Sequence, residues 1–161
     1  IYKNCIRAFG HSDKQVVLSV GNKVRMEDLG SIPDSFIVKR FVPQLDIIRR
    51  SQVFITHGGA NSISEGLYYG VPLVVVPQAF DQFMGAEMVE RIGAGIYIRN
   101  NEAGAEELAA AVERLIRDGS VKERCEFVRD SFKTAGGARK AVESVLAFVR
   151  KEKNQKVSCS G

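Results

Sequence analysis

Short runs of apolar residues alternate with helical patterns along most of the chain. Five runs rich in β-branched residues are bounded by turn residues, a pattern typical of strands. The predicted strands are Gln15–Val20, Phe36–Lys39, Val53–Thr56, Leu73–Val76 and Gly95–Ile98. Because these runs are apolar on both faces and helical segments separate them, the sequence predicts an α/β fold, a parallel sheet with helices on both faces.

Helical periodicity occupies the segments between and after the strands. A first helix is predicted from Ile1 to Phe9, where the pattern stops at a glycine. The other predicted helices are Leu45–Ser51, Asn61–Tyr69, Asp81–Ile92, Leu108–Ile116, Val121–Phe132 and Ala138–Val149. The basic end of the chain is interpreted as a solvated, fraying tail. We therefore divide the chain into one domain, 1–150, and a flexible tail, 151–161.

Composition narrows the class of protein. The chain has 161 residues, 45% of them hydrophobic, which suits one compact domain, and no apolar run reaches the ~20 residues of a membrane helix. Its net charge of +4 is spread along the chain, which argues against nucleic-acid binding. The three cysteines form no Cys-x-x-Cys pair and suit a reducing, cytoplasmic location. The chain begins without methionine or signal peptide, so we expect it to be a piece of something longer.

The richest group of polar residues follows the third predicted strand. Ligands of parallel sheets bind beyond the carboxyl ends of the strands, which is where His57 and two glycines lie. The glycines allow a sharp turn, and Asn61 and Ser62 can cap the next helix while its free N–H groups face the crevice. These features predict an anion site to which His57 can donate a hydrogen bond. On this segment alone, a buried histidine beside a tight turn is an equally good interpretation.

Polar and aromatic residues beyond other strands extend this picture. Glu65, one turn into the next helix, can accept ribose hydroxyls, or it is a solvated glutamate favoured by the helix dipole. After the fourth strand, Asp81 and Gln82 can bind sugar hydroxyls; helix capping alone would explain Asp81 but not Gln82. Phe41, after the second strand, can stack on a base, or it is a core residue.

Four elements of the sequence together resemble a known signature. They are Phe41-Val42-Pro43-Gln44, His57-Gly58-Gly59-x-Asn61-Ser62-x-x-Glu65-Gly66, Gly70-Val71-Pro72 and Pro77-x-x-x-Asp81-Gln82. Their order and spacing are similar to the nucleotide-sugar signature of glycosyltransferase family 1, the UDP-glycosyltransferases, and most closely to its macrolide-glycosyltransferase branch. The signature covers 42 residues, from Phe41 to Gln82, and the similarity extends to about Val149.

The resemblance implies a GT-B enzyme with two Rossmann-like domains, of which this chain is the C-terminal, donor-binding one. The acceptor-activating histidine of the family lies in the N-terminal domain, so no catalytic base is expected here, and we interpret His11 as a surface residue. The family also places a strand ahead of the first helix. In the doubly wound order that strand is central, so we expect an N-terminally truncated domain whose sheet lacks its first strand.

The resemblance also implies which residues hold each part of a UDP-sugar donor. The implied set is Phe41 and the Val42 backbone for uracil, Gln44 and Glu65 for the ribose, His57, Gly59, Asn61 and Ser62 for the diphosphate, and Asp81 and Gln82 for the transferred sugar. Gln82 at the end of the signature is similar to glucose-using relatives and favours UDP-glucose.

The sequence contains no Asp-x-Asp pair or other carboxylate cluster for a magnesium ion. We therefore expect no metal and no cofactor, with the helix dipole, backbone N–H groups and His57 stabilising the leaving diphosphate. The family's reaction is inverting transfer of a hexose to a hydroxyl of a small-molecule acceptor.

Two other functions remain open at this point. The chain can be a non-catalytic donor-binding subunit of a split glycosyltransferase, awaiting a membrane-bound companion. It can also belong to a UDP-sugar epimerase, since such enzymes share the GT-B architecture. The Asp81-Gln82 pair and the Pro43-Gln44 step favour a transferase over an epimerase.

Overall fold

The computed structural model describes residues 1–99 and 103–158. In chain order, its elements are α1 (Tyr2–Phe9), β1 (Val16–Ser19), the 3-10 helix η1 (Met26–Leu29), β2 (Phe36–Lys39), α2 (Gln44–Ile48), β3 (Phe54–Thr56), α3 (Ala60–Tyr68), β4 (Leu73–Val75), α4 (Phe80–Arg91), β5 (Gly95–Tyr97), α5 (Ala105–Arg117), α6 (Gly119–Thr134) and α7 (Gly137–Ser158). Each predicted strand is present, and its ends differ from the prediction by at most one residue.

All strand pairs are parallel, but the strands form two separate sheets. β1 pairs with β2, with Val16 opposite Phe36, and the second sheet has the order β3-β4-β5, with Phe54 opposite Leu73 and Leu73 opposite Gly95. Within residues 1–99 and 103–158, no strand pairs with both sheets and joins them into one. The predicted parallel α/β architecture is therefore confirmed, with an interruption where the resemblance implies a further strand.

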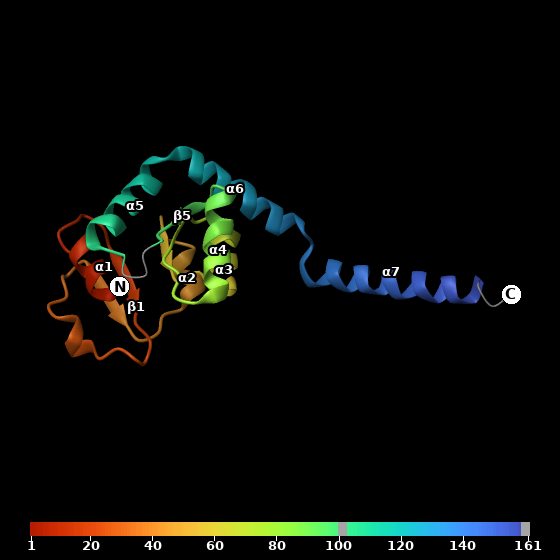
Figure 1. Cartoon of the computed structure of the whole chain (residues 1–161), viewed down its shortest axis with the longest axis horizontal. Helices are drawn as coiled ribbons and strands as arrows, with labels where there is room; N and C mark the ends of the chain where they lie inside the picture. Colours follow the sequence, from red (N-terminus) through yellow and green to blue (C-terminus); the bar gives the residue numbers. More distant parts are fainter. Residues whose placement is uncertain (100–102, 159–161) are drawn as a thin grey trace.

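Helices cover the sheets on two faces. On one face, α1 packs against α5, and a buried cluster that includes Phe9, Leu18, Val74 and Leu108 joins residues from both sheets. On the other face, α3, α4 and α6 cover the three-stranded sheet. Figure 1 shows α5 running from the α1 side of the molecule toward the start of α6. The strand β4 is buried on both faces, as expected for the inner strand of a parallel sheet.

Helix bounds differ from the sequence prediction at several places, of which α2 is one, and α5 begins three residues before its predicted start. α2 ends at Ile48, three residues before the predicted end, because Arg50 and Ser51 bond back to the carbonyl groups of Ile47 and Ile48 in tight turns. The 3-10 helix η1, which the sequence analysis does not predict, lies in the connection between β1 and β2. It is anchored by the buried side chain of Leu29.

The last helix, α7, projects away from the rest of the molecule (Figure 1). Its apolar side chains, among them Val142, Val145, Leu146 and Phe148, are exposed. The helix includes residues 151–158, so the expected boundary between domain and tail at position 150 falls inside it. Among the described residues, none of the helices combines the length and apolar character that crossing a membrane requires.

Two buried cysteines provide a first test of the packing. Desolvation raises the pKa of the Cys5 thiol and that of the Cys125 thiol to about 11 each, because burial disfavours the thiolate. We expect both to resist iodoacetamide at pH 8 in the native chain and to react once the chain is unfolded in urea, as measured by mass spectrometry. Rapid native labelling at either position would contradict this packing. The third cysteine, Cys159, lies outside the described residues.

Candidate functional site

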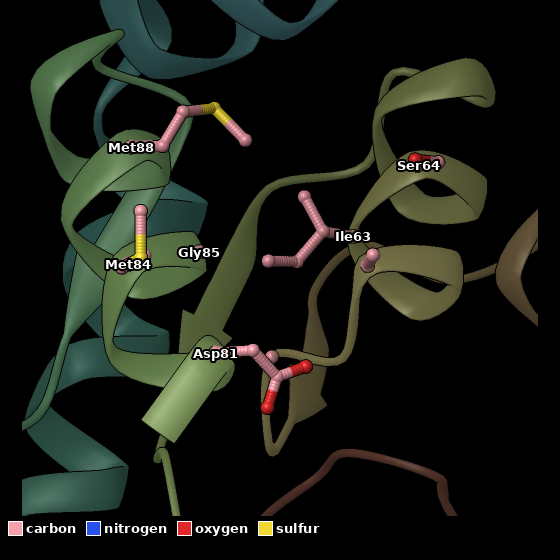
Figure 2. Close-up of a pocket in the computed structure, with 8 residues that line it drawn as sticks. Ile63, Ser64, Asp81, Met84, Gly85 and Met88 are labelled. Atoms are coloured by element: carbon pink, nitrogen blue, oxygen red, sulfur yellow. The ribbon is translucent and has the colours of Figure 1, made fainter. Parts of the chain in front are cut away.

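The predicted site residues lie where the strands give way to helices. β3 leads through His57, Gly58 and Gly59 into α3, and β4 leads through a short loop into α4. Because β3 and β4 are parallel neighbours, both transitions lie at the same edge of the sheet. In Figure 2 the first turns of α3 and α4 face each other across a hollow, with Asp81 at one end.

Gly58 is the residue that makes the turn after β3 possible. Its φ of +89° is a left-handed conformation that favours glycine. A Cβ at this position would lie 2.5 Å from Val75 Cγ1 and 3.3 Å from the backbone oxygen of Gln82. Thr56, a buried polar residue, accepts a hydrogen bond from the Gly58 N–H at 3.3 Å. The sequence predicted a sharp turn for both glycines, while the resemblance assigned donor binding to Gly59 alone.

The N-terminus of α3 lacks a side-chain cap. The N-cap residue is Gly59, so the expectation that Asn61 and Ser62 cap this helix is wrong; they are the second and third residues inside it. The capping position falls on Gly59 because the helix already begins at Ala60. The first bond into the helix runs from the Ile63 N–H to the Gly59 carbonyl, and the three preceding N–H groups have no partner among the described residues. These N–H groups and the helix dipole create a positive end suited to an anion.

His57 stands beside this helix end and is exposed. The interpretation of His57 as a buried structural histidine is therefore wrong. Its ring lies against the turn, since a Cβ added to Gly59 would be only 2.9 Å from His57 Nε2. The imidazole and the open N–H groups of α3 thus lie at the same end of the helix, where they can bind one anion together.

Gln44 and Glu65, which the resemblance assigns to one sugar ring, are in direct contact. The Gln44 Nε2 donates a hydrogen bond of 2.6 Å to Glu65 Oε2, joining the start of α2 to the second turn of α3. Nearby in the chain, Phe41 is 70% exposed, so its interpretation as a core residue is wrong, while Val42 is half-buried. An exposed ring next to a polar pair is an arrangement that can stack on a planar group.

At the start of α4, Gln82 caps the helix and Asp81 does not, which is the reverse of what the sequence predicts. Gln82 is the capping residue: its Oε1 accepts hydrogen bonds from the N–H groups of Gln78, at 2.8 Å, and Ala79, at 3.1 Å. A glutamine at the third helical position can reach back in this way, as in a capping box. Asp81 occupies the second position of the helix, is exposed and does not cap it.

A shallow hollow of about 300 Å³ lies between α3 and α4. Figure 2 shows Ile63 and Ser64 of α3 opposite Met84, Gly85 and Met88 of α4. Gly85 allows this close packing, since a Cβ there would lie 2.9 Å from the Gly58 carbonyl oxygen. In the described part of the chain, no three His, Cys, Asp or Glu side chains are grouped so that they could hold a metal ion.

The chain is similar in sequence to bacterial glycosyltransferases. Over 151 residues it is 40% identical to the uncharacterized UDP-glucosyltransferase YojK of Bacillus subtilis, covering 94% of this chain and 37% of that protein. It is 37% identical to the oleandomycin glycosyltransferase of Streptomyces antibioticus, covering 91% of this chain and 34% of that protein. The chain therefore spans little more than a third of the length of these curated relatives.

Structural comparison agrees with the sequence relatives. A solved structure of the glycotransferase of kitacinnamycin superposes with a TM-score of 0.83 at 37% identity, covering 89% of this chain and 38% of that one. The fold matches the C-terminal half of GT-B glycosyltransferases. A family model described as "Erythromycin biosynthesis protein CIII-like, C-terminal domain" matches residues 3–146. The chain therefore belongs to the family of erythromycin biosynthesis protein CIII-like C-terminal domains.

Proposed function

We propose that this chain is the donor-binding half of a glycosyltransferase that transfers a hexose from a UDP-sugar to an acceptor hydroxyl with inversion. The observation that carries the proposal is the grouping, at one edge of the sheet, of an uncapped helix N-terminus, an exposed histidine and the Gln44–Glu65 pair. Relatives named as glycosyltransferases support the reaction class.

In this proposal the diphosphate of the donor lies at the N-terminus of α3. The backbone N–H groups of residues 60–62 and the His57 ring donate to its oxygens, with Asn61 and Ser62 supplying side-chain donors from the first turn. Negative charge grows on the diphosphate as the sugar leaves. The proposal assigns stabilisation of that charge to these preorganised donors, which is electrostatic catalysis by the chain itself.

The nucleoside would lie across α2 and α3. Gln44 holds the Glu65 carboxylate at 2.6 Å, and the remaining acceptor capacity of that carboxylate serves the ribose hydroxyls. The exposed ring of Phe41 is free to stack on uracil, with the Val42 backbone reading the base edge.

The transferred sugar would lie against the start of α4. The side-chain Oε1 of Gln82 already accepts hydrogen bonds from two backbone N–H groups. Its side-chain amide nitrogen, Nε2, is therefore the atom left to donate to a hydroxyl. Asp81 supplies the complementary acceptor. A donor–acceptor pair of this kind suits the vicinal hydroxyls of a hexose, and we favour UDP-glucose.

The remaining parts of the enzyme belong outside this chain in the proposal. The acceptor domain and the catalytic base would come from the part of the protein that the curated relatives have in addition, and no cofactor is required. The acceptor would be a small molecule. Cys5 and Cys125 are free thiols, which fits a reducing, cytoplasmic setting.

Replacing His57 with alanine tests the proposal. In the longer protein that contains this chain, we expect His57→Ala to weaken UDP binding about tenfold or more in isothermal titration calorimetry, because a hydrogen bond to a charged phosphate is lost. Transfer of the sugar should fall with it. The matched control is His11→Ala, an exposed histidine in the turn after α1, which should leave UDP affinity unchanged. Unchanged UDP affinity in His57→Ala would refute the diphosphate role.

Product analysis tests the reaction class separately. Incubation of the longer protein with UDP-glucose and an acceptor alcohol should release UDP and a glucoside of inverted anomeric configuration, detected by NMR. Conversion of UDP-glucose into an epimer without release of UDP would contradict the transferase assignment while leaving the donor site intact.

A further inference from the structure

The second turn of α4 lies directly against the turn that follows β3. A Cβ added to Gly85 would lie 2.9 Å from the carbonyl oxygen of Gly58 and 2.7 Å from Ile63 Cδ1, closer than real Cβ atoms come to other atoms. Gly85 and Ile63 are on the facing helices of Figure 2. Any side chain at position 85 must therefore displace one of these neighbours, so this glycine sets how near α4 stands to the turn.

The backbone of α4 gives no reason for a glycine at this position. Gly85 is not among the glycines with a positive φ, and it lies in the middle of a helix of 12 residues. Glycine is less favourable than alanine in a helix interior, because it loses more conformational freedom when the helix forms. The close approach to Gly58 and Ile63 is therefore the structural reason for Gly85.

The two neighbours differ in how easily they can move. Ile63 Cδ1 is the end of a side chain, and Ile63 lines the hollow between α3 and α4, which has room for it. The Gly58 carbonyl belongs to the backbone of a buried residue whose N–H is bonded to Thr56 Oγ1 and whose Cα lies against Val75 of β4. Because the turn is packed on β4, it has no room to retreat, and a larger residue at position 85 would push α4 away from it.

This contact joins the two parts of the proposed donor site. Gly58 belongs to the turn that carries His57 and leads into the open N–H groups of α3. Asp81 and Gln82 precede Gly85 by one turn of α4. A single donor has to contact both parts at once, with its diphosphate on the first and its transferred sugar on the second. The distance between α4 and the turn therefore determines whether the sugar and the diphosphate are held in the geometry that the reaction needs.

We propose that Gly85 is a positioning residue for sugar transfer, which acts through Gly58 to fix the spacing between the diphosphate-binding turn and the sugar-binding start of α4. This inference rests on the proposed function and deepens it. Because Gly85 sets the relative position of two groups, it affects the transfer step more than it affects the binding of UDP, which contacts only the α2–α3 side of the site.

Gly85→Ala tests this inference in the longer protein that contains this chain. We expect kcat for transfer from UDP-glucose to fall about tenfold or more, since displacements well below 1 Å are enough to misplace reacting groups. The affinity for UDP in isothermal titration calorimetry should stay within about threefold of that of the unsubstituted protein. A purely structural role would lower the melting temperature without lowering kcat, so kcat is measured well below the melting transition of each variant.

Two matched variants separate the backbone contact from other effects. Gly119→Ala adds the same methyl group at the first residue of α6, where an added Cβ meets no atom within 4 Å, and should leave kcat unchanged. Ile63→Val removes Cδ1 and with it the side-chain overlap only. Alone it should leave kcat unchanged, and in the double variant Ile63→Val/Gly85→Ala most of the loss in kcat should remain, because the Gly58 carbonyl is still in the way.

Three results would overturn the role of Gly85. They are an unchanged kcat in folded Gly85→Ala, full recovery of kcat in the double variant, and a loss of UDP affinity as large as the loss of kcat, which would mean that the turn moves and α4 does not. If Gly85→Ala does not fold, the double variant, which has one overlap fewer, provides the same comparison of kcat with UDP affinity. Failure of the proposed function is distinguishable, because the unsubstituted protein itself would then neither bind UDP nor transfer the sugar.

Discussion

Gly58→Ala is expected to lower the free energy of unfolding by about 3 kcal/mol and to abolish UDP binding. The alanine would hold a left-handed backbone at φ +89° and place its Cβ 2.5 Å from Val75 Cγ1, in a buried strand. Relief of this overlap requires the turn to move away from β4. The N–H groups at the start of α3 would move with it, so the anion site would be lost together with stability.

Gly21→Ala is the matched control for this substitution. Gly21 also has a positive φ, of +67°, but an added Cβ there meets no atom within 4 Å. The control substitution should therefore lower the free energy of unfolding only through its unfavourable backbone conformation, by about 1 kcal/mol, and leave UDP affinity unchanged. Urea denaturation of the three proteins measures the difference. If both substitutions lower the free energy of unfolding equally, the overlap with Val75 does not contribute to the loss of stability.

Leu108→Ala is expected to have the second large effect, a loss of about 3 kcal/mol in the free energy of unfolding. Leu108 lies on α5, is fully buried and belongs to the cluster that joins the two sheets. A cavity at this position removes contacts to both sheets at once. We therefore expect hydrogen exchange to accelerate in β1 and β2 more than in β4, because β4 is also packed on its other face by the α3–α4–α6 cluster.

Ile116→Ala on the same helix is the control. Ile116 is 38% exposed. Its truncation should therefore lower the free energy of unfolding by less than about 1 kcal/mol. The comparison separates loss of the shared core from the change in helix propensity, since both substitutions introduce alanine, the residue with the highest helix propensity. A uniform change in exchange across all strands of Leu108→Ala would contradict the idea that this residue couples two sheets.

The strands could be predicted from sequence because each is a short apolar run closed by turn residues, and β4, buried on both faces, is the clearest case. The end of α2 could not be predicted in the same way. Its last turn is decided by local bonds of Arg50 and Ser51, and these leave no trace in the hydrophobic pattern. The separation of β1 from β3 was predicted only through the family resemblance, since periodicity does not report strand order.

The site was predicted less completely than the fold. The family resemblance assigned Gln44 and Glu65 to one sugar ring, and their side chains are hydrogen-bonded. Capping was predicted wrongly at both helices, because propensity ranks Asn, Ser and Asp as caps without knowing where the first helical residue falls. At α4 the helix begins early enough for Gln82 to reach back to Gln78 and Ala79, which excludes a capping role for Asp81.

Under the proposed function, the hydrogen bonds of Gln82 affect how donor preference can change during evolution or engineering. A substitution at Gln82 removes the acceptor for two backbone N–H groups as well as any contact to a sugar, so a gain in selectivity there carries a folding penalty. Asp81 is exposed and makes none of the capping bonds, so a substitution there carries no such folding penalty. Libraries for altered sugar use should therefore begin at Asp81, and variants at Gln82 should be combined with a stabilising background.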